Sequence, residues 1–290
     1  MSTSPSIHRA LPVAGASADG RRPAAAKRTP RRPGPGALLA ISWLAPAVVV
    51  VLWEILARAG SLSPQVLPAP SKVAATAWQL IQQGRLISDL GTSLLRAAAG
   101  FVIGGSIGFV LGTAVGFSRL AEALLDRSIQ MVRAVPFLAV LPLVIVWFGV
   151  DEGGKIFLVS LGVMFPIYIN TVLGIRQVDP KLLELGRVTG LNHRQMIRRI
   201  VLPGALPSIL AGVRYALAVA WLALVVAETI ATSSGIGFLA MDAREFLRTD
   251  VIVLTIVVYA GIGVLSDAIA RLLERRLLAW HANYAAGGRR

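Results

Sequence analysis

The stretch that decides the fold is 184–203, which reads ELGRVTGLNHRQMIRRIVLP. It is charged and polar, and it interrupts a chain whose neighbouring segments, 156–175 and 207–230, are strongly apolar. Apolar runs of about 20 residues are long enough to cross a membrane as helices. A polar stretch of this length between two such runs predicts a well-defined segment outside the membrane, placed to contact a partner.

This stretch is predicted to form two short helices joined by a turn. Asp179 precedes Pro180, which is the arrangement of an N-cap residue followed by proline at the first helical position. Gly190 is placed to end the first helix in a left-handed turn. Asn192 and Gln195 have the spacing of a capping box at the start of the second helix.

The second helix is predicted to end at Pro203, because the residue before a proline disfavours the helical region. This half of the stretch is basic through Arg194, Arg198 and Arg199. A loop lying on lipid head groups is one alternative interpretation, and a DNA-binding helix–turn–helix is another. The nearby spans disfavour DNA, and the ordered caps favour docking to a protein.

Composition is typical of a polytopic helical membrane protein. Of the 290 residues 55% are hydrophobic and 15% are charged, whereas about 25% are charged in soluble domains. We predict an all-α fold with about six transmembrane helices, at 37–56, 97–117, 129–150, 156–175, 207–230 and 251–270. Residues 1–36 are expected to be a disordered basic tail, 37–270 the membrane domain with the loop 180–203, and 271–290 a second basic tail.

Five glycines recur at every fourth position of the second predicted span, namely Gly100, Gly104, Gly108, Gly112 and Gly116. Residues four apart share one face of a helix, and small residues let a neighbouring backbone approach closely. We interpret this face as a packing surface. Its partner helix can belong to the same chain or to a second copy, and the sequence leaves both open.

Lysine and arginine are unevenly distributed between the predicted loops. If both termini are cytoplasmic, 21 of the 29 basic residues lie on the cytoplasmic side, counting Arg133 at the beginning of the third predicted span, and 7 lie in external segments. Cytoplasmic loops carry an excess of Lys and Arg, so cytoplasmic termini and a cytoplasmic 184–203 stretch are predicted. The net charge of +14 then needs no nucleic acid as a partner.

The sequence contains no recognisable catalytic, cofactor or metal constellation. It has no cysteine, its histidines (His8, His193 and His281) are far apart, and the phosphate-binding pattern G-x-x-x-x-G-K-[ST] does not occur. No nucleophile, base and acid converge in the pattern. We therefore expect no enzyme activity, no cofactor and no metal.

The 184–203 stretch resembles the "EAA" loop of ABC importer permeases. That pattern is Glu, two small or apolar residues, three of any kind, Gly, nine of any kind, and Ile-x-Leu-Pro. The matching residues are Glu184, Leu185, Gly186, Gly190, Ile200, Leu202 and Pro203, with Leu185 and Gly186 in place of two alanines. The resemblance implies the ABC importer permease fold in a bacterial inner membrane, and docking of this loop to a separate cytoplasmic ATPase. It also implies a homodimer, an extracytoplasmic substrate-binding protein and transport by alternating access.

The wider resemblance covers about 43–284 and is closest to the sulfonate, taurine and nitrate group of these permeases. It is carried by segments such as 67–70, 133–139, 165–171 and 241–250. Segment 241–250 is most like the corresponding segment of aliphatic sulfonate permeases, and this resemblance implies a small organic anion as the substrate. Taurine, nitrate or another small substrate is an alternative. A self-sufficient secondary transporter is a further alternative. It is disfavoured because no inverted repeat is evident in the sequence.

Two charged residues stand inside the fifth predicted span. Arg214 lies near its inner end and Glu228 near its outer end. A charge within a span is a functional candidate, so both are candidates for the translocation path or a gate. The alternatives are an ion pair with another helix or snorkelling for Arg214, and a structural role near the outer end for Glu228. Asp267 in the sixth span is an expected interhelical partner.

Overall fold

A computed structural model describes residues 35–230 and 232–280, and within these ranges the regular structure is helical, without strands. The all-α prediction is confirmed. The chain divides into two compact units, Met1–Val48 and Val49–Arg290. The described part of the first unit is the beginning of α1 (Pro35–Arg58). Most of the predicted tail 1–36 therefore lies outside the described residues.

Five described helices are long and apolar enough to cross a membrane. They are Ile41–Arg58 of α1, α3 (Arg85–Phe117), α7 (Glu152–Arg176), a continuous helix His193–Ile230, and α12 (Thr249–Leu277). A bent pair, Arg119–Ala134 with Ala139–Phe148, brings the number to six if it is one span.

The third span differs from its prediction as one helix over 129–150. α5 (Arg127–Ala134) and α6 (Phe137–Phe148) meet at a bend of 103°. Val135 is extended, with ψ 124°, because the ring of Pro136 disfavours the helical region for the residue before it. The proline thus separates two helices, where a kink within one helix was expected.

Two predicted span ends also need correction. α3 begins at Arg85, twelve residues before the expected start, so Arg96 lies inside a helix and not in a loop. α12 runs to Leu277, so the first part of the predicted tail 271–290 continues the last span. Residues 281–290 lie outside the described residues.

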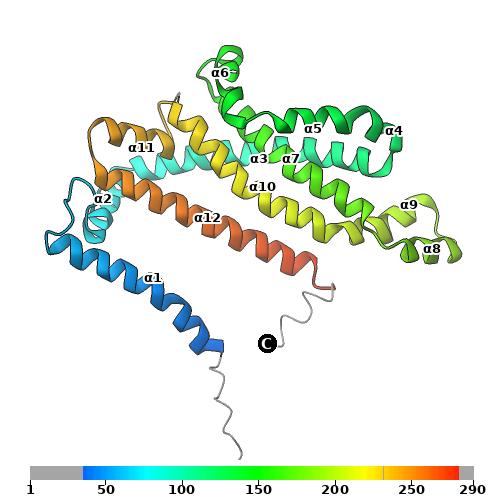
Figure 1. Ribbon diagram of the computed structural model, residues 1–290, viewed down its shortest axis with the longest axis horizontal. Coiled ribbons are helices and arrows are strands. Elements are labelled where there is room, and N and C mark those ends of the chain that lie inside the picture. The colour runs from blue at the N-terminus through cyan, green and yellow to red at the C-terminus, as the bar shows by residue number, and fades with distance from the viewer. Residues whose placement is uncertain (1–34, 231, 281–290) are drawn as a thin grey trace, which may run out of the picture. The chain divides into compact units, whose positions relative to one another are not determined.

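The centre of the second unit is formed by α3, α7 and α10 (Leu202–Ile230), which run alongside one another (Figure 1). The glycine face of α3 packs on α7 within this chain. A Cβ atom added at Gly104 would lie 2.1 Å from the Ser160 carbonyl oxygen, and one added at Gly108 would lie 2.4 Å from that of Met164. Small residues therefore bring the two backbones into direct contact. Buried residues beside this contact are Ala97, Val159, Val163, Ile167, Ala216, Ala220, Ala223 and Leu224.

A second apolar cluster joins α2 (Pro70–Gln82), the start of α3, α11 (Ile236–Glu245) and α12. It includes Val73, Leu86, Leu239 and Val251. A side chain of α1 caps the first turn of α2, because the Ser71 amide donates to the Glu54 carboxylate at 3.0 Å. The apolar cluster packs α11 against α2, α3 and α12, next to the polar network described below.

Candidate coupling helices, polar network and cavity

The predicted helix pair forms α8 (Pro180–Val188) and α9 (His193–Met196), at one end of α7 and α10 (Figure 1). Its caps match the prediction. The Asp179 carboxylate accepts from the Lys181 amide at 2.9 Å. Gly190 is left-handed, with φ +74°. Asn192 and Gln195 exchange reciprocal backbone–side-chain bonds of 2.9 and 3.0 Å, which is a capping box.

The predicted end of the second helix at Pro203 is wrong. α9 continues through a π-helical turn, η2 (Ile197–Val201), into α10, and the whole helix His193–Ile230 has 38 residues. A proline inside a regular α-helix loses one hydrogen bond and clashes with the carbonyl four residues before it. A π-turn shifts the hydrogen-bond register at that point, which lets the helix continue past the proline.

Gly186 is the point at which α8 crosses the second helix. A Cβ atom there would lie 2.7 Å from the Met196 sulfur and 2.8 Å from the Ile200 Cδ1 atom. The absence of a side chain therefore sets how closely the two helices approach. Among residues predicted from the EAA pattern, Gly186 is buried, whereas Leu185 is 58% exposed.

The outer face of α8 is apolar and uncovered. Leu182, Leu185 and Val188 follow one another at intervals of three residues and are 47%, 58% and 87% exposed. Residues three apart are neighbours on a helix surface, so these side chains form one patch. Glu184 is exposed beside it. We call this the α8 face. An apolar patch outside the spans is typical of a protein contact surface.

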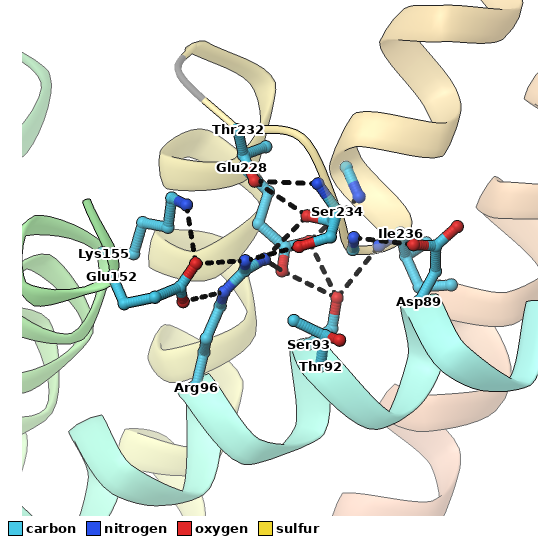
Figure 2. A network of polar contacts seen from close by, with 12 residues as sticks. Asp89, Thr92, Ser93, Arg96, Glu152, Lys155, Glu228, Thr232, Ser234 and Ile236 are labelled. Carbon is cyan, nitrogen blue, oxygen red and sulfur yellow. Dashed lines mark hydrogen bonds and ion pairs between the residues drawn. The ribbon is translucent and has the colours of Figure 1, made fainter. Parts of the chain in front are cut away.

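At the opposite end of α10, a buried polar network joins three helices (Figure 2). The Arg96 guanidinium on α3 donates to Glu228 on α10 at 2.7 Å, and to both carboxylate oxygens of Glu152 on α7 at 2.5 and 2.6 Å. Arg96 is 2% exposed and Glu228 is 1% exposed. Lys155 adds a contact of 3.0 Å to Glu152. A buried charge needs such partners, because its desolvation is otherwise uncompensated.

The loop before α11 is part of the same network. The amide of Gly237 donates to Glu228 at 2.9 Å, and Arg96 donates to the Ser234 carbonyl at 2.8 Å. Gly235 has φ +108°, and a Cβ atom there would lie 2.4 Å from the Glu228 Oε1 atom. Only glycine therefore fits both the backbone conformation and the space.

The α3 members of this network were not predicted from the sequence. Asp89 accepts from the Gly235 amide, and Ser93 accepts from the Ile236 amide and contacts Glu228 at 2.7 and 2.8 Å. The signal was present, because Ser93 and Arg96 precede Gly100 at helical spacing on one face. A span predicted to start at residue 97 placed them in a loop.

The two candidate path residues of the fifth span have different surroundings. Glu228 belongs to the buried network. Arg214 contacts Asp267 on α12 at 2.6 Å, and Arg271 pairs with the same carboxylate. The alternative of an ion pair between helices is therefore the observed arrangement for Arg214. Neither residue lines the cavity described next, and a gating role for them stays a prediction.

A cavity of about 830 Å³ lies between the α5–α6 bend, α7 and α10. Its described walls are mainly apolar and aromatic, with Trp147, Phe157, Phe165 and Leu222 among them. Arg133 is the one charged side chain among these lining residues, and Asn170 and Tyr215 add polar groups. The arrangement can receive a small molecule with an apolar part and a negative charge.

These features define a helical membrane protein of the transport class, with a cavity between its spans and an exposed helix pair beyond them. A family model described as "Binding-protein-dependent transport system inner membrane component" matches residues 100–279. The chain belongs to this family, and it is a permease subunit of the ABC importer type.

Curated relatives match over most of their length. The putative aliphatic sulfonates transport permease protein SsuC of Escherichia coli (strain K12) is 54% identical over 242 residues, which are 83% of this chain and 92% of the relative. The protein of the same name from Bacillus subtilis (strain 168) is 46% identical, over 83% and 87%. The taurine transport system permease protein TauC of Escherichia coli (strain K12) is 36% identical, over 81% and 87%.

The fold is also found among solved structures. A chain in the crystal structure of an amino acid ABC transporter aligns with a TM-score of 0.59 at 18% identity, covering 69% of this chain and 97% of that one. This likeness supports the fold alone, and the predicted ABC importer permease fold is confirmed.

Proposed function

We propose that this chain is the membrane-spanning subunit of an ATP-driven importer of small organic anions, with aliphatic sulfonates as its substrates. The observation that carries the proposal is the α8 face, an uncovered apolar patch on a capped helix pair outside the spans. The substrate class is supported by 54% and 46% identity to two aliphatic sulfonates permeases.

In this proposal the chain supplies the translocation path, and partner proteins supply the energy and the substrate. A cytoplasmic ATPase covers the α8 face, and its ATP-driven closure moves the helix pair together with α10. A binding protein delivers the substrate from outside, and two copies of the chain enclose the path. The conformational change is alternating access, in which each ligand shifts the population of inward- and outward-open states. ATP hydrolysis belongs to the partner.

The α8 face can be tested by matched aspartate variants. In Val188→Asp a charge replaces an 87% exposed apolar side chain, and we expect at least a tenfold loss of co-purified ATPase, because a charge within an apolar contact is desolvated without a partner. The control is Val66→Asp, where a 77% exposed valine lies in the connection between α1 and α2, on the proposed external side.

Equal retention of the ATPase by wild type and both variants would contradict the docking proposal. Equal loss in both would mean that the charge disturbs the fold and not a docking surface. Uptake by vesicles without ATP, driven by an ion gradient, would favour the secondary transporter instead.

Taurine is the second candidate substrate, because the taurine permease is 36% identical over 240 residues. Reconstituted vesicles containing the chain, its ATPase and its binding protein should take up ethanesulfonate faster than taurine. The opposite order would move the assignment to taurine and leave the importer class intact.

A further inference from the structure

We propose that Arg133 is the anion-selecting residue of the path, and that the apolar residues lining the same 830 Å³ cavity receive the alkyl chain of the substrate. The inference rests on the proposed function and deepens it from a substrate class to a binding site. It concerns described residues of α5, α6, α7 and α10.

The first argument is charge. The described lining holds one cation and no carboxylate. Arg133 makes no ion pair or hydrogen bond with the described residues, in contrast to Arg96, Arg176 and Arg214. A guanidinium offers a planar fork of donors that suits the oxygens of a sulfonate group. Arg133 is exposed at the cavity surface, so its guanidinium is accessible to an anionic occupant.

The second argument is position. α4 (Arg119–Ala121) and η1 (Glu122–Asp126) run antiparallel to α7, because Glu122 contacts Arg176 at 2.8 Å and Asp126 accepts from Tyr168 at 2.6 Å. Arg133 lies seven residues after Asp126, about 10 Å further along a helix. This brings it level with the central part of α7, where the cavity-lining Leu161 lies. An ionisable residue at this depth typically lines a substrate path.

The third argument is shape. An aliphatic sulfonate has a permanently charged head and an apolar tail. Besides Arg133, the cavity is lined by Leu161 and Phe165 of α7 and by Val219 and Leu222 of α10. The combination of one fixed cation with an apolar wall matches an anion that carries an alkyl chain better than it matches nitrate, which has no tail to bury.

The role of the Arg133 charge in substrate uptake can be tested in vesicles that contain the chain, its ATPase and its binding protein. We expect Arg133→Gln to lower ATP-dependent ethanesulfonate uptake at least tenfold, and Arg133→Lys to restore part of it, because lysine keeps the charge and lacks the planar fork. ATP hydrolysis stimulated by the binding protein should persist in both, since the α8 face is untouched. The matched control is Arg127→Gln, an exposed arginine on the same helix that does not line the cavity.

Binding of the substrate's alkyl chain by the apolar wall can be tested independently of Arg133. Val219→Trp narrows the apolar wall, so uptake of hexanesulfonate should fall at least fivefold more than uptake of methanesulfonate. Each rate is divided by the wild-type rate for the same substrate, which cancels the preference of the binding protein.

The outcomes separate the two proposals. Wild-type vesicles that import no sulfonate would overturn the proposed function. If the wild type imports and Arg133→Gln imports equally fast, or falls no further than Arg127→Gln, the site is overturned and the importer stands. If Arg133→Gln fails to assemble, the Val219→Trp ratio decides, and an unchanged ratio overturns the site.

Discussion

At the scale of single residues, Arg96 is the residue on which the buried polar network depends. It contacts Glu152, Glu228 and Ser234, which lie 56, 132 and 138 positions away in the sequence. Such separations explain why the pairing of these residues with one another could not be predicted. Glu228 was a candidate because it is a charge within a predicted span, but no local signal indicates which distant cation it meets.

Removing this cation should destabilise the fold strongly. We expect Arg96→Met to cost about 3–5 kcal/mol, because it leaves the buried Glu228 carboxylate without its counter-ion. The measurement is thermal unfolding of the purified protein in detergent. Arg214→Met is the control, since its pair with Asp267 is 46% and 34% exposed and about 0–1 kcal/mol is typical of such pairs. Equal destabilisation by both substitutions would argue against this role of the network.

At the scale of helices, the caps were predictable and the prolines were not. Asp179, Gly190 and the Asn192–Gln195 box act within a few residues, so local sequence is enough to place them. Pro136 and Pro203 look alike in sequence, yet the chain bends by 103° at the first and runs on through a π-turn at the second. Tertiary packing decides between these outcomes, because a proline only weakens the helix and does not set its new direction.

The glycine face of α3 gives a prediction about helix packing. Gly104→Ala should destabilise the protein by about 1–3 kcal/mol through overpacking, because the added Cβ would lie 2.1 Å from the Ser160 carbonyl oxygen. Gly91→Ala in the same helix meets no atom within 4 Å and should be neutral or stabilising by up to about 1 kcal/mol. Thermal unfolding of both variants is the measurement. A neutral Gly104→Ala would mean that α3 and α7 are further apart than described.

At the scale of the whole molecule, topology can be measured directly because the natural sequence has no cysteine. A membrane-impermeant maleimide added to intact spheroplasts should label Val66→Cys, which lies between α1 and α2. It should label Arg119→Cys, at the start of α4 (Arg119–Ala121), only after the membrane is opened. The expected difference follows from the excess of Lys and Arg on the cytoplasmic side. The reverse pattern would invert the orientation and place the α8 face outside.

The continuous helix His193–Ile230 has a mechanical consequence. At 1.5 Å per residue its 38 residues extend roughly 57 Å, with α9 at one end and Glu228 close to the other. It is a lever. A tilt of about 5° pivoted at α9 would carry the far end by about 5 Å, more than the length of any hydrogen bond in the Arg96 network. A rotation of the helix that begins at α9 would therefore move Glu228, which pairs with Arg96 near the far end.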